Sequence, residues 1–87
     1  MNYFILHRYV WQIGTNEHEV SIFNGYSKEH GLEGEHEGFN STRKKEILKF
    51  LKDEGFATKP QLETISDLCS QKQRGIVDCN GKYLGEY

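Results

Sequence analysis

The fold is decided by residues 3–13, which have the sequence YFILHRYVWQI. This stretch is rich in β-branched and aromatic residues and is too short for a buried helix of normal length, so it predicts a β-strand. On a period of two, alternate residues from Tyr3 to Ile13 share one face, and those from Phe4 to Gln12 share the other. Because both faces are partly apolar, we expect a central strand, or a strand whose second face meets a partner.

A second strand is expected directly after the first. Residues 14–17, GTNE, have the composition of a turn. Residues 18–26 then resume a strand pattern, with Val20, Ile22 and Tyr26 on one side. The two strands form an N-terminal β-hairpin.

Residues 27–40 have a different composition. They carry three glycines and four glutamates, and only Leu32 and Phe39 are apolar. This composition predicts a mobile acidic loop. A loop of about 14 residues is long for a compact domain, and such loops are usually functional or disordered.

Two helices are expected next. The first is capped by Asn40 or Ser41 and runs to Glu54, with one apolar stripe facing the core. Gly55 can adopt the left-handed conformation of a Schellman motif, which packs Phe56 back against the helix.

The second helix has a marked beginning and end. Thr58, Pro60 and Gln61 supply a capping residue, an early proline and a reciprocal glutamine, and Gly75 is expected to end the helix. The apolar stripe consists of Leu62, Ile65, Leu68 and Cys69.

The chain closes with a second predicted hairpin. Asn80 and Gly81 form the dipeptide most typical of a tight hairpin turn, so Val77 should face Leu84 across it. With 87 residues, only one hydrophobic core can form. We therefore predict one α+β domain over residues 1–87 with the order ββααββ.

Composition also indicates a compartment. No apolar run approaches the roughly 18 residues that a membrane span requires, and the first residues lack the features of a signal peptide. Cys69 and Cys79 are too few for a disulfide framework, so both are expected to be small buried thiols. These observations predict a cytoplasmic protein.

Charge is segregated along the chain. Residues 1–40 hold two basic and six acidic side chains, whereas residues 41–87 hold nine basic and seven acidic ones. The acidic segment can complement a basic protein surface and accelerate docking, or it can simply be solvated. The candidate partner-binding glutamates are Glu29, Glu33, Glu35 and Glu37.

Aromatic residues of the first strand are a second candidate. Tyr3, Tyr9 and Trp11 recur on a period of two, as in a base-stacking platform or a binding hot spot. A stripe of this kind also serves as core, and a small chain has few other residues with which to build one. Tyr9 and Trp11 are the partner-binding candidates.

Basic residues of the first helix are a third candidate. Arg43, Lys44 and Lys45 lie at its start, where the helix dipole disfavours cations. They can form a site for phosphate or carboxylate, or they can be solvated or paired with the acidic segment. Together with Lys49 and Lys52 they are the candidate nucleic-acid contacts.

No pattern for catalysis or for a cofactor is present. His30 and His36 with the two cysteines lack the spacing of a zinc site. His18 and Glu19 are neighbours in a strand and so point to opposite faces, as would His36 and Glu37 in a strand. We therefore expect no metal, no cofactor and no enzymatic activity, with a small nuclease as the third functional alternative.

Residues 43–68 resemble the first two helices of a winged-helix DNA-binding domain. The resemblance rests on Ile47, Leu48, Phe50 and Leu51, on Gly55, Phe56 and Thr58, and on Leu62 and Ile65. It implies that the hairpin at 75–86 corresponds to the wing. That family reads DNA with a third helix, for which only residues 70–74 are available here.

The sequence favours a protein-binding module over an enzyme. Small inhibitors of phage and mobile elements, including anti-CRISPR proteins, are similar in size and in lacking an active site. We expect an inhibitor, an immunity-type protein or a regulator that covers a basic surface of a larger target, such as a nucleic-acid-binding complex. A nucleic-acid-binding regulator that uses the basic helix is the alternative.

Overall fold

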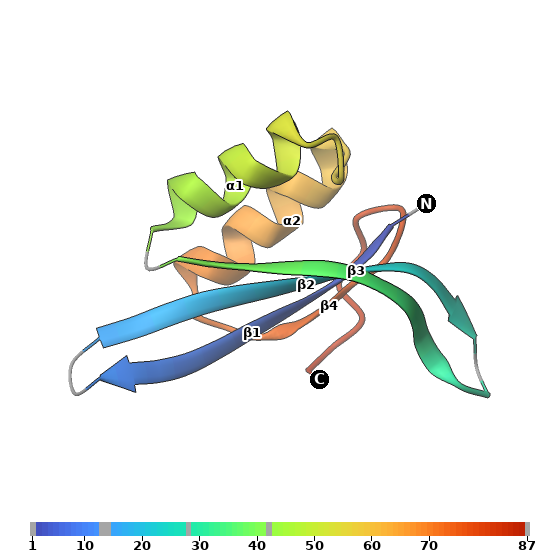
Figure 1. Cartoon of the computed structure of the whole chain (residues 1–87), viewed down its shortest axis with the longest axis horizontal. Coiled ribbons are helices and arrows are strands. Elements are labelled where there is room, and N and C mark those ends of the chain that lie inside the picture. The colour runs from blue at the N-terminus through green and yellow to red at the C-terminus, as the bar shows by residue number, and fades with distance from the viewer. Residues whose placement is uncertain (1, 13–14, 28, 42, 87) are drawn as a thin grey trace.

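The computed structural model describes residues 2–12, 15–27, 29–41 and 43–86, without the side chains of residues 8–12, 15–17 and 35–37. A β-sheet forms one layer and two helices form a second layer on one of its faces (Figure 1). The predicted α+β class is confirmed. The predicted order ββααββ is wrong, because a third strand precedes the helices.

Strands β1 (Tyr3–Gln12) and β2 (Thr15–Ser27) form the predicted N-terminal hairpin. They pair antiparallel, and Tyr3 lies opposite Phe23. β2 begins at Thr15, so the expected turn at 14–17 is mostly strand. β1 lies between β2 and β4, which confirms that it is a central strand.

Strand β3 (Gly31–Ser41) replaces the predicted mobile loop. It pairs antiparallel with β2 along its length, from Ser27 opposite Gly31 to His18 opposite Ser41. The prediction failed because glycines and charges were taken as loop signals, whereas pairing with a long neighbouring strand overrides a weak intrinsic preference. Phe39 supports the pairing, since its ring stacks on Phe50 of the first helix with centroids 4.4 Å apart.

Strand β4 (Gly75–Val77) pairs antiparallel with residues 4–6 of β1 and completes the sheet order β3-β2-β1-β4. After β4 the chain reverses, and Val77 bridges Tyr83. The predicted reversal is present, but its register differs, because Tyr83 and not Leu84 lies opposite Val77.

The geometry of the turn explains this register. The N–H of Gly81 donates to the carbonyl of Asp78 (3.0 Å), which makes a four-residue turn. The Asp78 carboxylate accepts from the N–H groups of Asn80 and Lys82. The turn thus begins with aspartate and ends with glycine, a common type I pattern, and differs from a two-residue Asn-Gly turn.

Helix α1 (Lys44–Asp53) begins later than predicted. Its N-cap is Arg43, because the expected capping residues belong to β3. Ser41 still acts at this end, where its hydroxyl accepts from the N–H of Arg43 (3.0 Å) and donates to Glu46 (2.8 Å). Glu46 consequently lies in the first turn, where the helix dipole favours a negative charge.

The predicted end of α1 is confirmed. Gly55 has a φ of +72°, the left-handed conformation. The N–H of Phe56 donates to the carbonyl of Leu51 (3.0 Å), as in a Schellman motif. The rings of Phe56 and Phe50 lie 5.9 Å apart, so the chain folds back onto the helix.

Helix α2 (Lys59–Ser70) begins with the predicted capping box of Thr58 and Gln61. It ends earlier than predicted, because Lys72 and not Gly75 takes the positive φ, at 54°. Gly75 lies in β4, where the Tyr83 ring occupies the space that a Cβ would need. A glycine needed for close packing was therefore misread as a helix end.

One hydrophobic cluster lies between the sheet and the helices. Its buried members are Phe4, Leu6, Val20, Ile22, Ile47, Leu51, Ile65, Leu68, Cys69 and Val77. Phe4 and Leu6 of β1 and Val20 and Ile22 of β2 thus face the helices, as the period of two requires. Neither helix of the described chain has both the length and the apolarity for a membrane span.

Candidate functional site

An apolar groove lies on the sheet face opposite the helices. Its volume is about 360 Å³, and all four strands contribute to it. The groove is lined by Ile5 of β1, Phe23 and Tyr26 of β2, Gly31 and Leu32 of β3, and Ile76 of β4. Apolar concave surfaces of this size are typical of binding sites.

The groove exists because the β2–β3 hairpin runs beyond the rest of the sheet and curves (Figure 1). The pairing of β1 with β2 reaches only as far as Phe23 of β2, so beyond this residue the β2–β3 hairpin has only two strands. Two-stranded ribbons twist more strongly than larger sheets. A register shift between Ser21 and Phe23 gives β3 one extra residue, which bends the strand further. Gly34, with a φ of +69°, accommodates the Asn24 side chain where a Cβ would lie.

Because of this twist, Tyr26 lies on a different face of the sheet from the predicted one. Val20 and Ile22 are fully buried in the core, whereas Tyr26 is 47% exposed and lines the groove with Phe23. The three predicted side chains therefore do not share a face, because the period of two holds only while the ribbon is not strongly twisted.

Tyr26 is held against a second aromatic ring. The rings of Tyr3 and Tyr26 are stacked, with centroids 5.9 Å apart and an interplanar angle of 28°. A side-chain hydrogen bond with Cys79 raises the pKa of Tyr3 above its ordinary value. These contacts connect one wall of the groove to the C-terminal turn.

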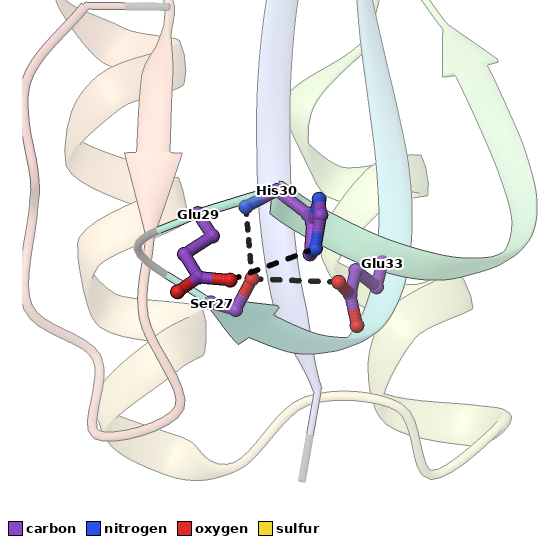
Figure 2. Close-up of polar contacts among 4 residues, drawn as sticks. All are labelled: Ser27, Glu29, His30 and Glu33. Atoms are coloured by element: carbon purple, nitrogen blue, oxygen red, sulfur yellow. Dashed lines mark hydrogen bonds and ion pairs between the residues drawn. The ribbon is translucent and has the colours of Figure 1, made fainter.

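The tip of the hairpin is acidic. The Ser27 hydroxyl accepts from the N–H of His30 (3.0 Å) and donates to the carboxylate of Glu33 (3.4 Å) (Figure 2). The carboxylate of Glu29 lies 3.8 Å from the His30 ring, and both side chains are exposed. Glu29 and Glu33 each lie two residues from Gly31, which lines the groove, so both belong to the end of the hairpin that forms one side of the groove.

Of the predicted partner-binding residues, only some are described in full. Glu29 and Glu33 are exposed at the hairpin tip, each two residues from Gly31 of the groove lining. The remaining four lie in strands, with side chains outside the described ones: Glu35 and Glu37 in β3, and Tyr9 and Trp11 in β1.

The predicted basic residues lie on the helix layer, away from the groove. The guanidinium of Arg43 lies 4.0 Å from the carboxylate of Glu46, and the ammonium of Lys44 donates to the hydroxyl of Ser70 (2.9 Å). The side chains of Arg43 and Lys44 therefore point towards different partners. Exposed lysines follow one side of α1 at helical spacing: Lys45, Lys49 and Lys52.

Residues with possible chemical roles are separated. The described residues include no cluster of three His, Cys, Asp or Glu side chains that could hold a metal ion. Burial raises the pKa of Cys69 to about 11, so it is a neutral thiol at pH 7. Cys79 is only half-buried, contrary to prediction. His18 is buried and Glu19 is partly exposed, which agrees with their predicted opposite directions.

Sequence reasoning missed the residues that line the groove. Phe23 and Ile76 were assigned only to strands, and Leu32 was an isolated apolar residue in an acidic segment. That isolation was the available signal, because a leucine among glycines and glutamates has few local packing partners. Comparisons with protein-family models, with curated proteins and with solved structures found no match for the chain.

Proposed function

We propose that this protein is a small non-enzymatic binding module, an inhibitor or regulator that covers a basic surface of a larger protein. The observation that supports this proposal is that one projecting hairpin carries the exposed Glu29 and Glu33 and, between them in sequence, Gly31 and Leu32 of an apolar groove. Protein interfaces commonly combine an apolar centre with a polar rim. The hairpin end has both parts.

The charge of the hairpin supports a basic partner. Residues 27–41 contain four glutamates and one lysine, a formal charge of −3. Concentrated charge of one sign on a projecting element attracts the opposite charge and raises the rate of encounter.

The non-enzymatic part of the proposal is supported by the state of the described nucleophile and acid–base candidates. The Cys69 thiol is buried, and its raised pKa disfavours the reactive thiolate. His18 and Glu19 lie on opposite faces of β2, so they do not form an acid–base pair.

Affinity capture at moderate salt tests this proposal. The immobilised protein is exposed to an extract of its native host, beside the variant Glu29→Lys/Glu33→Lys. Asp53→Lys/Glu54→Lys is the matched control, because it reverses two exposed charges at the far end of α1. We expect the wild type and the control to retain the same protein and the hairpin variant to lose it. Equal retention by all three would contradict the proposal.

A second candidate function is nucleic-acid binding through α1. The supporting observation is the exposed row of Lys45, Lys49 and Lys52. The winged-helix resemblance adds little, since β4 lies within the sheet and no third helix occurs between α2 and β4 in the described chain.

A salt titration distinguishes the two candidates. Binding to DNA or RNA that weakens steeply with salt, and that is lost in Lys45→Glu/Lys49→Glu, would favour the second candidate and overturn the first. Absence of nucleic-acid affinity at low salt would exclude the second.

A further inference from the structure

We propose that the groove is the anchor pocket of this interface and that it receives one apolar side chain of the partner, flanked in the partner by lysine or arginine. This inference rests on the proposed function and specifies the partner's segment. The groove binds the apolar side chain, and the carboxylates of Glu29 and Glu33 bind the flanking cations.

The lining of the groove favours an apolar side chain. Among its six described lining residues, only Tyr26 carries a polar side-chain group. Pockets for small polar ligands usually contain several convergent polar groups that fix the ligand's orientation. Ile5 forms the floor at 4% exposure, whereas Leu32 and Ile76 are half-buried and able to bury further area.

The site is largely formed before a partner binds. Stacking on Tyr3 restrains Tyr26, and the Ser27 hydroxyl restrains Glu33. Groups that are already ordered lose less conformational entropy on association, so a small pocket can contribute usefully to affinity.

Charge complementarity selects a basic protein segment over other occupants. A symmetric contact with a second copy would place the two acidic hairpins against each other. Nucleic acids and anionic membrane surfaces carry the same sign of charge as Glu29 and Glu33 at the hairpin tip. A segment with an apolar residue between cations matches both the groove and the acidic hairpin tip beside Gly31.

Synthetic peptides test this inference through the amide spectrum of the labelled protein. Each peptide has a central residue between two lysines on either side, and the central residue is leucine, phenylalanine or serine. A fourth peptide has central leucine between glutamates. We expect the leucine and phenylalanine peptides with lysines to shift the amides of Ile5, Gly31 and Leu32, with at least tenfold higher affinity than the other two.

Two variants of one residue type provide the matched comparison. Leu32→Ser removes a wall of the groove, whereas Leu84→Ser changes a leucine that is 43% exposed and lies outside it. We expect at least a tenfold loss of peptide affinity in the first and none in the second. Tyr26→Ala is the additional groove variant should Leu32→Ser lose its dispersed spectrum, because Tyr26 is largely exposed.

The outcomes separate this inference from the proposed function. Binding that requires Glu29 and Glu33 but not the central apolar residue would overturn the anchor pocket and leave the binding module intact. Absence of any groove shift would overturn the anchor pocket alone, because host capture tests the module independently. Concentration-dependent dimerisation that Leu32→Ser abolishes would identify a second copy as the occupant and overturn the inference.

Discussion

The two faces of the sheet are built from alternating residues of the same strands, yet they differ in what covers them. On the helix face, Phe4, Leu6 and Val20 have no exposed surface. On the other face, apolar side chains surround a groove, and neither α1 nor α2 lies on that face of the sheet (Figure 1). Apolar residues on the first face are needed for folding, whereas those at the rim of the groove leave apolar area available to a partner.

Replacing a core ring should have the largest effect. Phe4→Ala is expected to lower the free energy of unfolding by about 3–5 kcal/mol, because it leaves a cavity in the hydrophobic cluster between the sheet and the helices. Phe23→Ala on the other face should lose clearly less, since Phe23 is only half-buried. Urea denaturation of both variants measures the difference. Equal losses would break the distinction between the faces.

Replacing a buried polar side chain should have the second largest effect on stability. Gln61 is 1% exposed; its amide donates to the carbonyls of Asn2 (2.8 Å) and Asp78 (3.0 Å) and accepts from the N–H of Thr58 (2.9 Å). Gln61→Ala leaves partly buried backbone groups unpaired and should cost about 1–3 kcal/mol in urea denaturation. The exposed Gln71 provides the control, since Gln71→Ala should change stability by no more than about 0.5 kcal/mol.

The buried thiol predicts a smaller effect that is confined to alkaline pH. Burial raises the pKa of Cys69 from its ordinary value of 9.0 to about 11, so the folded protein holds this proton more tightly than the unfolded chain does. The contribution of the protonated Cys69 thiol to the free energy of unfolding is complete below pH 9 and is lost as the pH rises towards 11. Cys69→Ala should therefore show a shallower loss of unfolding free energy across this range. Parallel curves for the two proteins would argue against thiol burial as its cause.

The smallest effect on stability is expected at the hairpin tip. Glu29→Gln/Glu33→Gln should change the free energy of unfolding by less than about 0.5 kcal/mol, because exposed charges contribute little to folding. The same variant should weaken partner capture. A marked loss of stability would assign these carboxylates a structural role and weaken the comparison between the faces.

Features that depend only on residues close together in the sequence were predictable. The strand-forming residues of β1, the left-handed Gly55 and the Thr58 capping box all follow from interactions within a few residues. The exposed position of Glu29 and Glu33 was likewise expected from their surroundings of glycine and charge.

Features that depend on distant partners were not predictable. β3 forms because β2 continues far enough to pair with it, against the weak strand preference of its own residues. Gly75 was misread as a helix end because its role depends on the ring of Tyr83, which occupies the space of a Cβ at this position. Tyr83 lies later in the chain and outside the helix. The groove requires residues of four strands, so no local pattern contained it.

By itself, the sequence determined the α+β class, the central position of β1, the capped start of α2 and the segregation of charge. The tertiary structure alone decided that the acidic segment is a strand and that Tyr26 leaves the face of Val20 and Ile22. The physical reason is range: capping and periodicity act over a few residues, whereas strand pairing, twist and the groove depend on contacts between residues far apart in the chain.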